Sequence, residues 1–227
     1  MKVIDSGLNN IVRIAEDAPP KFSEKFQVNI NGSNNKIIFA AGVTGKRIII
    51  DINGNNNRVL VGKNCVLNGS ISAKSDGNTI SIGKFTTIGG VRIECEYGMH
   101  ISLGEDCMLS RDIVIRSGDS HSIIDLNTKK RINMPRSVRI GKHVWMGYGV
   151  NIGKGAIVQD NTVIGMGSYV NKMFLTGNVI IAGVPAKIVK ENIVWDRRSL
   201  TNDVPESHIN SLIDNYCFDE SKLLTLE

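Results

Sequence analysis

Apolar residues recur at every sixth position in the stretch "RIGKHVWMGYGVNIGKGAIVQDNTVIGMGSYVNK", which runs from Arg139 to Lys172. An amphipathic helix would place apolar residues three and four apart, and a half-buried strand would place them two apart. A period of six fits neither pattern. A fixed period predicts a repeat architecture in which each repeat stacks on the next. The recurring residues are Ile140, Met146, Ile152, Val158, Ile164 and Val170.

Two further positions of the six-residue unit have a preferred side chain. A glycine usually follows the large apolar residue, as at Gly141, Gly147 and Gly153, and the third residue after that glycine is usually small. Glycine suits a corner, where the backbone adopts unusual angles, and a small side chain suits an inward position with little space. Three such strands close one triangular coil of about eighteen residues, and the coils stack in parallel as a solenoid.

The repeat extends towards the N-terminus with a longer period. The segments "INGSNNK" (Ile30–Lys36) and "INGNNNR" (Ile52–Arg58) lie 22 residues apart, which fits a coil with a few extra residues at one corner. We therefore predict an all-β fold, with a cap segment over residues 1–27 and one parallel β-solenoid over residues 28–190. An ordinary β-sandwich would not explain six consecutive matches to one spacing.

Two other segments depart from the repeat. The stretch "HSIIDLNTKKRINMPRS", residues 121–137, breaks the period with polar and basic residues, which predicts a loop extending from the coils. Such loops often carry functional residues. In the tail, residues 191–227, "DVPESHINSLIDNY" has apolar residues at helical spacing after a proline, which predicts a short C-terminal helix.

Composition narrows the possible environment and partners. No apolar run approaches the roughly 18 residues of a membrane span, and "MKVIDSGLNN" lacks the apolar core of a secretion signal. The four cysteines form no CxxC pair, so we expect reduced thiols and a cytoplasmic protein without membrane insertion. The net charge of +5 suits nucleic acid, a membrane surface or an acidic substrate. Nucleic acid is disfavoured, because the basic residues are scattered and are not interleaved with aromatic residues.

The repeat, the loop headed by His121, "IGKHVWMG" and "IIAGVPAKIVK" together resemble the hexapeptide-repeat acyltransferases. The likeness is good from Ile80 to Lys190. It implies a left-handed parallel β-helix, acetyl-CoA as co-substrate without a metal, and a homotrimer with sites between neighbouring solenoids. The longer early coils and "SGDSHSIID" are similar to the capsular polysialic acid O-acetyltransferases, which implies an anionic polysaccharide acceptor. A small free sugar or another small molecule is the alternative acceptor.

The same resemblance implies roles for individual residues. His121 would be the general base, and Trp145 would form a wall that orients the donor and the acceptor. Apart from the resemblance, Lys129, Lys130, Arg131 and Arg136 cluster in the loop, and of these Lys130 and Arg131 are expected to attract an anionic acceptor. The donor would contact Tyr148, Met166, Asn171, Lys172, Ala182, Lys187 and Lys190, whose lysines suit the phosphates of coenzyme A.

Two features depart from the sugar acetyltransferases of this family. His121 is followed by Ser122, where those relatives commonly have proline, and the helical N-terminal segment that helps them hold the acceptor is missing. Both differences concern the acceptor and leave the expected donor unchanged.

The role of His121 also follows from general chemistry. A hydroxyl becomes a good nucleophile only when its proton is removed, and a histidine performs this step well near neutral pH. We expect His143, at an outward repeat position, to be solvated, and we expect His100 at a corner and His208 in the tail helix. Two cysteines at inward positions, Cys65 and Cys107, favour direct attack over a covalent acyl-enzyme.

Two other classes of protein share this architecture. The γ-type carbonic anhydrases hold zinc with three histidines, and His100, His121 and His143 are 21 and 22 residues apart. The loop after His121 breaks that register, so we do not expect a metal site. A solenoid scaffold without activity is the other possibility, and Trp145 and "AGVPAK" argue against it.

Overall fold

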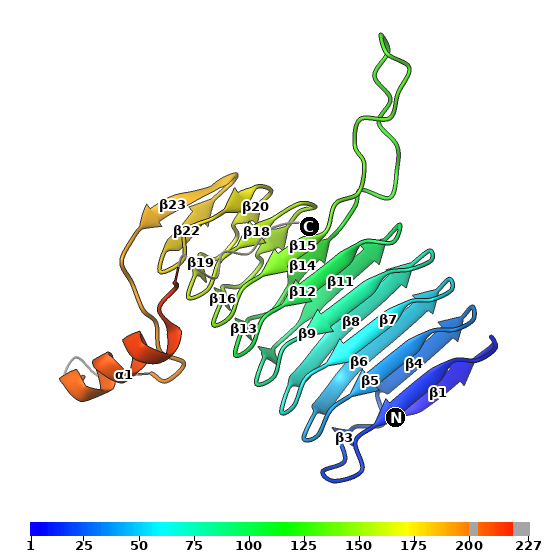
Figure 1. The fold of residues 1–227 in the computed structure, drawn as a ribbon, viewed down its shortest axis with the longest axis horizontal. Coiled ribbons are helices and arrows are strands. Elements are labelled where there is room, and N and C mark those ends of the chain that lie inside the picture. The colour runs from blue at the N-terminus through cyan, green and yellow to red at the C-terminus, as the bar shows by residue number, and fades with distance from the viewer. Residues whose placement is uncertain (200–203, 220–227) are drawn as a thin grey trace.

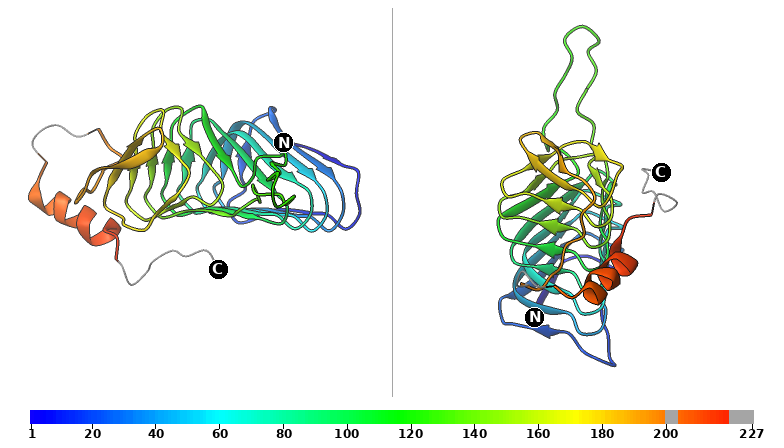
Figure 2. Two further views of the ribbon diagram at one scale, coloured as in Figure 1. Left: turned by 90° about the horizontal axis from the view of Figure 1, so that it is seen from above. Right: turned by 90° about the vertical axis from the view of Figure 1, so that its left-hand side faces the viewer.

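Each strand of this chain lies over a strand of the preceding coil, and three strand directions follow one another in each turn (Figures 1 and 2). The computed structural model describes residues 1–199 and 204–219. Twenty-two of the strands form about eight coils of a parallel β-helix, and one more strand folds back at the C-terminal end. The predicted fold, a left-handed parallel β-helix with a projecting loop and a short C-terminal helix, is confirmed.

The coils have three faces. The first contains β3 (Lys21–Phe22), β10 (Thr87–Ile88), β13 (Met108–Leu109), β16 (Trp145–Met146), β19 (Val163–Ile164) and β22 (Ile180–Gly183). The second contains β1 (Lys2–Asp5), β4 (Phe26–Asn31), β11 (Val91–Glu96), β14 (Ile113–Arg116), β17 (Asn151–Ile152) and β20 (Tyr169–Val170). The third contains β2 (Ile11–Ile14), β5 (Lys36–Phe39), β7 (Arg58–Val61), β9 (Thr79–Ile82), β12 (His100–Leu103), β15 (Val138–Ile140), β18 (Ile157–Val158) and β21 (Met173–Phe174).

Two long strands join the first and second faces into one sheet. β6 (Thr44–Asn53) and β8 (Val66–Lys74) bend around the corner between them, so the two faces form a fifteen-stranded sheet and the third an eight-stranded one. At the C-terminal end β23 (Ala186–Lys190) pairs antiparallel with β22, and α1 (Glu206–Tyr216) follows. Within the described residues, no helix is long and apolar enough to cross a membrane.

The sixfold series fills the interior as predicted. All six of its residues are at most 2% exposed, because alternate side chains of each short strand point inward. Strict register between coils places like side chains over like, as with Ile152 over Val170. Cys65 and Cys107 also lie inside the coil, fully buried. The result is one continuous apolar core along the solenoid axis.

A ladder of buried asparagines holds the second–third corner of the early coils. The carboxamide oxygen of Asn35 accepts the backbone N–H of Asn57 at 2.8 Å, and that of Asn57 accepts the N–H of Asn78 at 2.8 Å. All three side chains are at most 1% exposed. This stacking explains the 22-residue spacing of the two asparagine-rich segments, because each coil must present an asparagine at the same point of its corner.

The N-terminal segment differs from the separate cap that we expected. Residues 1–27 include β1, β2 and β3, which pair in parallel with β4, β5 and β6, so they form the first coil of the solenoid. The repeat is hard to see there because this coil has a core on one side only. Its apolar residues are therefore partly exposed, as at Val3 and Ile11.

We predict that Asn57→Ala lowers the denaturation midpoint more than Asn53→Ala does. Asn57 is buried and its loss leaves the N–H of Asn78 without a partner, at a cost of about 1–3 kcal/mol. Asn53 lies one strand earlier with an exposed side chain, so it is the matched control. Chemical denaturation followed by circular dichroism measures both, and equal midpoints would contradict a stabilising ladder.

Candidate active site

The loop that interrupts the repeat is a long projection that runs out from the coils and back (Figure 1). We call residues 117–137 the arm. It leaves the solenoid after β14 and returns at β15, at the corner between the second and third faces, and it extends well away from the coils (Figure 1). An antiparallel bridge joins Ile124 to Arg131, and the N–H of Ile132 donates to the carbonyl of Ile123 at 2.9 Å. The arm is therefore an ordered hairpin.

His121 lies in the base of the arm. Its backbone N–H donates to the carbonyl of Asp119 at 2.8 Å, and its own carbonyl accepts the amide N–H of Asn133 at 2.8 Å. The side chain is exposed, and its imidazole makes no hydrogen bond within the described residues. The backbone of His121 is therefore held in place while its imidazole is open to solvent.

A buried carboxylate supports the backbone just before His121. Glu96, at the end of β11, is 4% exposed and accepts the backbone N–H of Ser120 at 2.9 Å and its hydroxyl at 3.3 Å. Ser120 has a φ of +64°, an unfavourable backbone conformation for serine that these bonds stabilise. A Cβ at Gly118 would lie 1.9 Å from the same carboxylate, so a larger residue there would displace the Glu96 side chain.

Asn133 supports the backbone on the other side of the hairpin. Its side chain, 7% exposed, donates to the His121 carbonyl and to a carboxylate oxygen of Asp119, and accepts the N–H of Ile123 at 2.7 Å. Asp119 forms a salt bridge with Lys154 of the next coil. The hydrogen bond from Lys154, with a smaller contribution from Asn133, lowers the pKa of Asp119. Glu96 and Asn133 together fix residues 119–123.

Trp145 is remote from His121 in the same chain. It lies on β16, in the first face, and its side chain points outward with 38% exposure, as the repeat position predicted. The arm leaves from the corner between the second and third faces, which is the corner opposite the first face. One chain therefore does not bring these two residues together.

The arm carries large apolar side chains that nothing in the described part of the chain covers well. Their exposed fractions run from 49% to 78%, which is unusual for so many large apolar side chains in one short hairpin. They are Ile123, Ile124, Leu126, Ile132 and Met134.

Comparison with known proteins identifies the family. A polysialic acid O-acetyltransferase of Neisseria meningitidis is 34% identical over 194 residues, covering 86% of this chain and 89% of that protein. The chain belongs to the polysialic acid O-acetyltransferase family. A second member, from Escherichia coli O1:K1, is 39% identical over 139 residues, which is 61% of this chain but only 45% of that longer protein. No family model matched the chain.

A solved structure agrees with this assignment. The polysialic acid O-acetyltransferase OatWY superposes with a TM-score of 0.86 at 32% identity, covering 93% of this chain and 99% of that one. Membership of the polysialic acid O-acetyltransferase family makes this protein an O-acetyltransferase, and the left-handed β-helix is the fold of its structural neighbours.

The expected donor residues fall into two groups on the solenoid. Tyr148, Met166, Ala182 and Lys187 gather at the corner between the first and second faces, where the N–H of Gly167 donates to the Tyr148 carbonyl at 2.8 Å. Lys190 follows on β23, three residues beyond Lys187. Asn171 and Lys172 lie instead at the second–third corner, the one from which the arm leaves.

The thiols are poor candidates for a covalent step. Burial raises the pKa of Cys65 and Cys95 to about 11 and that of Cys107 to about 12, so these groups stay protonated and unreactive near neutral pH. Cys217, at the C-terminal end of α1, is exposed. Among residues 1–199 and 204–219, no three His, Cys, Asp or Glu side chains are grouped to hold a metal.

Our expectation for His143 was wrong. It is 2% exposed, because the C-terminal segment covers this outward position of the coil. His100 is exposed at the start of β12 and His208 lies in α1, as expected. Glu96 and Asn133 were missed altogether. The one available signal for Glu96 was an acidic residue at a strand end of the repeat, 25 residues before His121, and it does not identify a contact with the arm.

We predict that Asn133→Ala lowers kcat by up to on the order of 10²-fold, because a small displacement of a catalytic group is costly. The Michaelis constant of the donor should change little, since the expected donor residues lie on the coils and not on the arm. Arg92→Ala, an exposed position of β11, is the control. Steady-state kinetics measures kcat, and a thermal melt shows whether each variant is folded. An unchanged kcat in a folded Asn133→Ala variant would show that the base of the arm does not position His121.

Proposed function

We propose that this protein transfers the acetyl group of acetyl-CoA to a hydroxyl of polysialic acid by direct attack, with His121 as general base. The observation that carries this proposal is the exposed imidazole of His121 on a backbone clamped by Glu96 and Asn133. Likeness over most of the chain to proteins named polysialic acid O-acetyltransferase supports the choice of acceptor.

The reaction requires one proton to move twice. Acetyl-CoA supplies an activated acyl group on sulfur. His121 accepts the proton of the acceptor hydroxyl as its oxygen bonds to the acyl carbon, and the same ring returns that proton to the leaving thiolate as the carbon–sulfur bond breaks. The buried, protonated thiols support a direct transfer without an acyl-cysteine.

Features of the surface support a coenzyme A site at the corner between the first and second faces. Met166 is 76% exposed there, and the space beside Gly167 is open, with nothing within 4 Å of the position of a Cβ. Lys187 on β23 is exposed and has no ion-pair partner among the described residues, so it is available for a phosphate. The exposed apolar side chain of Met166 suits the pantetheine arm of coenzyme A, and Lys187 suits a phosphate of its nucleotide.

The charge of the surface supports an anionic acceptor. Lys129 and Lys130 are exposed on the arm and form no salt bridge within the described chain. Arg131 has a structural role as well, because its guanidinium bonds Asn133 and lies 5.6 Å from the ring centroid of Tyr97. The eight strands of the third face contain no Asp or Glu, and their Lys and Arg residues are Arg13, Lys36, Arg58 and Arg139.

The placement of His121 and Trp145 supports a homotrimer. A site that contains both residues needs the arm of one copy and the first face of another. The exposed apolar side chains of the arm would be covered by that neighbour, which removes their contact with water. We propose three sites, one at each interface.

Light scattering tests the assembly directly. A trimer should be found for the wild type, and Leu126→Asp, in the most exposed apolar residue of the arm, should shift it towards the monomer with loss of activity. A fully active wild-type monomer would refute the shared site.

We predict that His121→Ala lowers kcat by on the order of 10²–10⁴-fold, because the general base is lost while binding remains. The matched control is His100→Gln, an exposed histidine on β12 outside the proposed site. Thiol release from acetyl-CoA measures both variants. Near-normal turnover by His121→Ala would place the base elsewhere.

The acceptor is tested with a panel of neutral sugars, sialic acid monomer and polysialic acid. We predict turnover of the polymer with a Michaelis constant that rises with salt, because the attraction is screened over a Debye length of about 10 Å at 0.1 M. Lys129→Glu with Lys130→Glu should raise that constant and leave background hydrolysis of acetyl-CoA unchanged. Equal turnover of a neutral monosaccharide, without salt dependence, would instead favour a small-molecule acceptor.

A further inference from the structure

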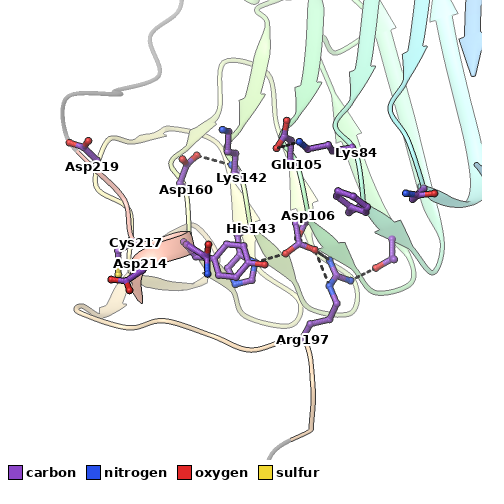
Figure 3. Close-up of a pocket in the computed structure, with 15 residues that line it drawn as sticks. Lys84, Glu105, Asp106, Lys142, His143, Asp160, Arg197, Asp214, Cys217 and Asp219 are labelled. Carbon is purple, nitrogen blue, oxygen red and sulfur yellow. Dashed lines mark hydrogen bonds and ion pairs between the residues drawn. The ribbon is translucent and has the colours of Figure 1, made fainter. Parts of the chain in front are cut away.

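The most fully buried histidine lies on the side of the solenoid away from the arm. We call residues 193–217 the strap, within which residues 200–203 lie outside the described part. The ring of His143 is stacked between Trp195 of the strap, at 3.9 Å between centroids, and Tyr216 of α1, at 3.6 Å, with an interplanar angle of 11° to each. Figure 3 shows the ring beside Asp106 and Arg197, at the wall of a pocket of about 650 Å³.

Both nitrogens of this ring face oxygens that can only accept. Nδ1 lies 3.0 Å from the Asp106 carboxylate, and Nε2 lies 3.0 Å from the backbone carbonyl of Trp195. A neutral imidazole has one N–H and one lone pair, so it satisfies one of these contacts and opposes a lone pair to the other. An imidazolium satisfies both. The two aromatic faces also favour a cation between them.

Asp106 provides the opposite charge and links the parts. Burial raises the pKa of this carboxyl, but hydrogen bonds from His143, the charge and hydrogen bonds of Arg197, and the Tyr216 hydroxyl together lower it below its usual value. Arg197 donates twice to one carboxylate oxygen, at 2.7 and 3.1 Å. The Asp106 carboxylate therefore connects its own coil to Arg197, near the start of the strap, and to Tyr216, near its end.

The same contacts extend to Trp145. The indole N–H of Trp195 donates to the backbone carbonyl of His143 at 2.8 Å, and Trp195 is 6% exposed. Its ring lies 5.8 Å from that of Trp145, at 43°. Trp145 is only two residues after His143, so the docked strap fixes one side of the tryptophan that we place at the acyl-transfer site.

We propose that His143 is held as an imidazolium, that its charge docks the strap onto the solenoid, and that Trp195 is thereby a positioning residue for Trp145. The docking is inferred from the contacts between the strap and His143 and Asp106, independently of the proposed function. The link to catalysis rests on the proposed function, because it takes Trp145 to line the acyl-transfer site.

The pH dependence has a definite sign. The strap contacts depend on the proton of His143, because a neutral imidazole donates to only one of the two oxygens that face the ring. Folding lowers the pKa of Asp106, so its contribution is present above the unfolded value of about 3.9 and is lost in acid. The charged and titratable groups that line the two pockets beside the ring are Lys84, Glu105, Asp106, Lys142, Asp160, Asp196, Arg197, Arg198, His208, Asp214, Tyr216, Cys217 and Asp219.

Docking is tested by NMR, without reference to activity. The chain has two tryptophans, so ¹⁵N-tryptophan labelling gives two indole signals, and Trp195→Phe assigns them. Labelling with ¹⁵N-histidine reads the protonation of His143 directly. We expect a doubly protonated ring at pH 6, and both indole signals should move together when that ring loses its proton. His143→Gln should abolish this joint movement, and His100→Gln should retain it. A neutral His143 at pH 6 with both indole signals unchanged up to pH 9 would overturn the proposal.

The catalytic link is tested by kinetics. Trp195→Ala should raise the acceptor Michaelis constant roughly fivefold to twentyfold with the donor constant unchanged, and Trp195→Phe, which keeps a ring, should restore most of the loss. Equal increases in the donor and acceptor Michaelis constants, or no recovery in Trp195→Phe, would show that Trp195 has only a structural role. If the wild type turned over none of the panel acceptors, the proposed function would fail. The Trp145 indole signal would then be compared between the wild type and Trp195→Ala. An unchanged signal would contradict the proposal that Trp195 positions Trp145.

Discussion

The inter-coil hydrogen bonds of a parallel β-helix allow each strand to pair only with the coils before and after it. Each coil must therefore return to the same register, or its inward side chains would face solvent. That constraint produces the sixfold series, the stacking of Ile152 over Val170 and the asparagine ladder through Asn57. It also limits insertions to the corners, because an extra residue within a strand would reverse the side chains that follow.

The two departures from the repeat carry the residues to which we assign the proposed function. At one corner the chain inserts the arm, and a buried carboxylate and a buried carboxamide hold its base so that His121 is fixed while its ring remains free. On the opposite side the strap covers the coil and fixes one side of Trp145 through Trp195. The rigid solenoid sets both positions. Under the proposed function, the chemistry depends on bringing the arm of one copy to the first face of another.

Sequence periodicity predicted the fold well because it follows from local spacing. The six inward residues, the arm and α1 all lie where the pattern placed them. The first coil was missed, because a terminal coil has a core on one side only and its apolar pattern is weaker. Contacts between distant segments were also missed. Glu96 lies under the arm, and His143 lies under a strap that begins 50 residues later, so a repeat position that normally faces water is buried in each case.

The central claim is that each active site is assembled from His121 of one chain and Trp145 of another. Mixing two inactive variants tests it most directly. Chains with His121→Ala and chains with Trp145→Ala are denatured together, refolded and assayed for thiol release, beside each variant refolded alone. Mixed trimers contain interfaces with an intact His121 from one chain and an intact Trp145 from the other, so the account predicts that activity reappears on mixing. Mixed trimers that form and remain as inactive as the separate variants would contradict it.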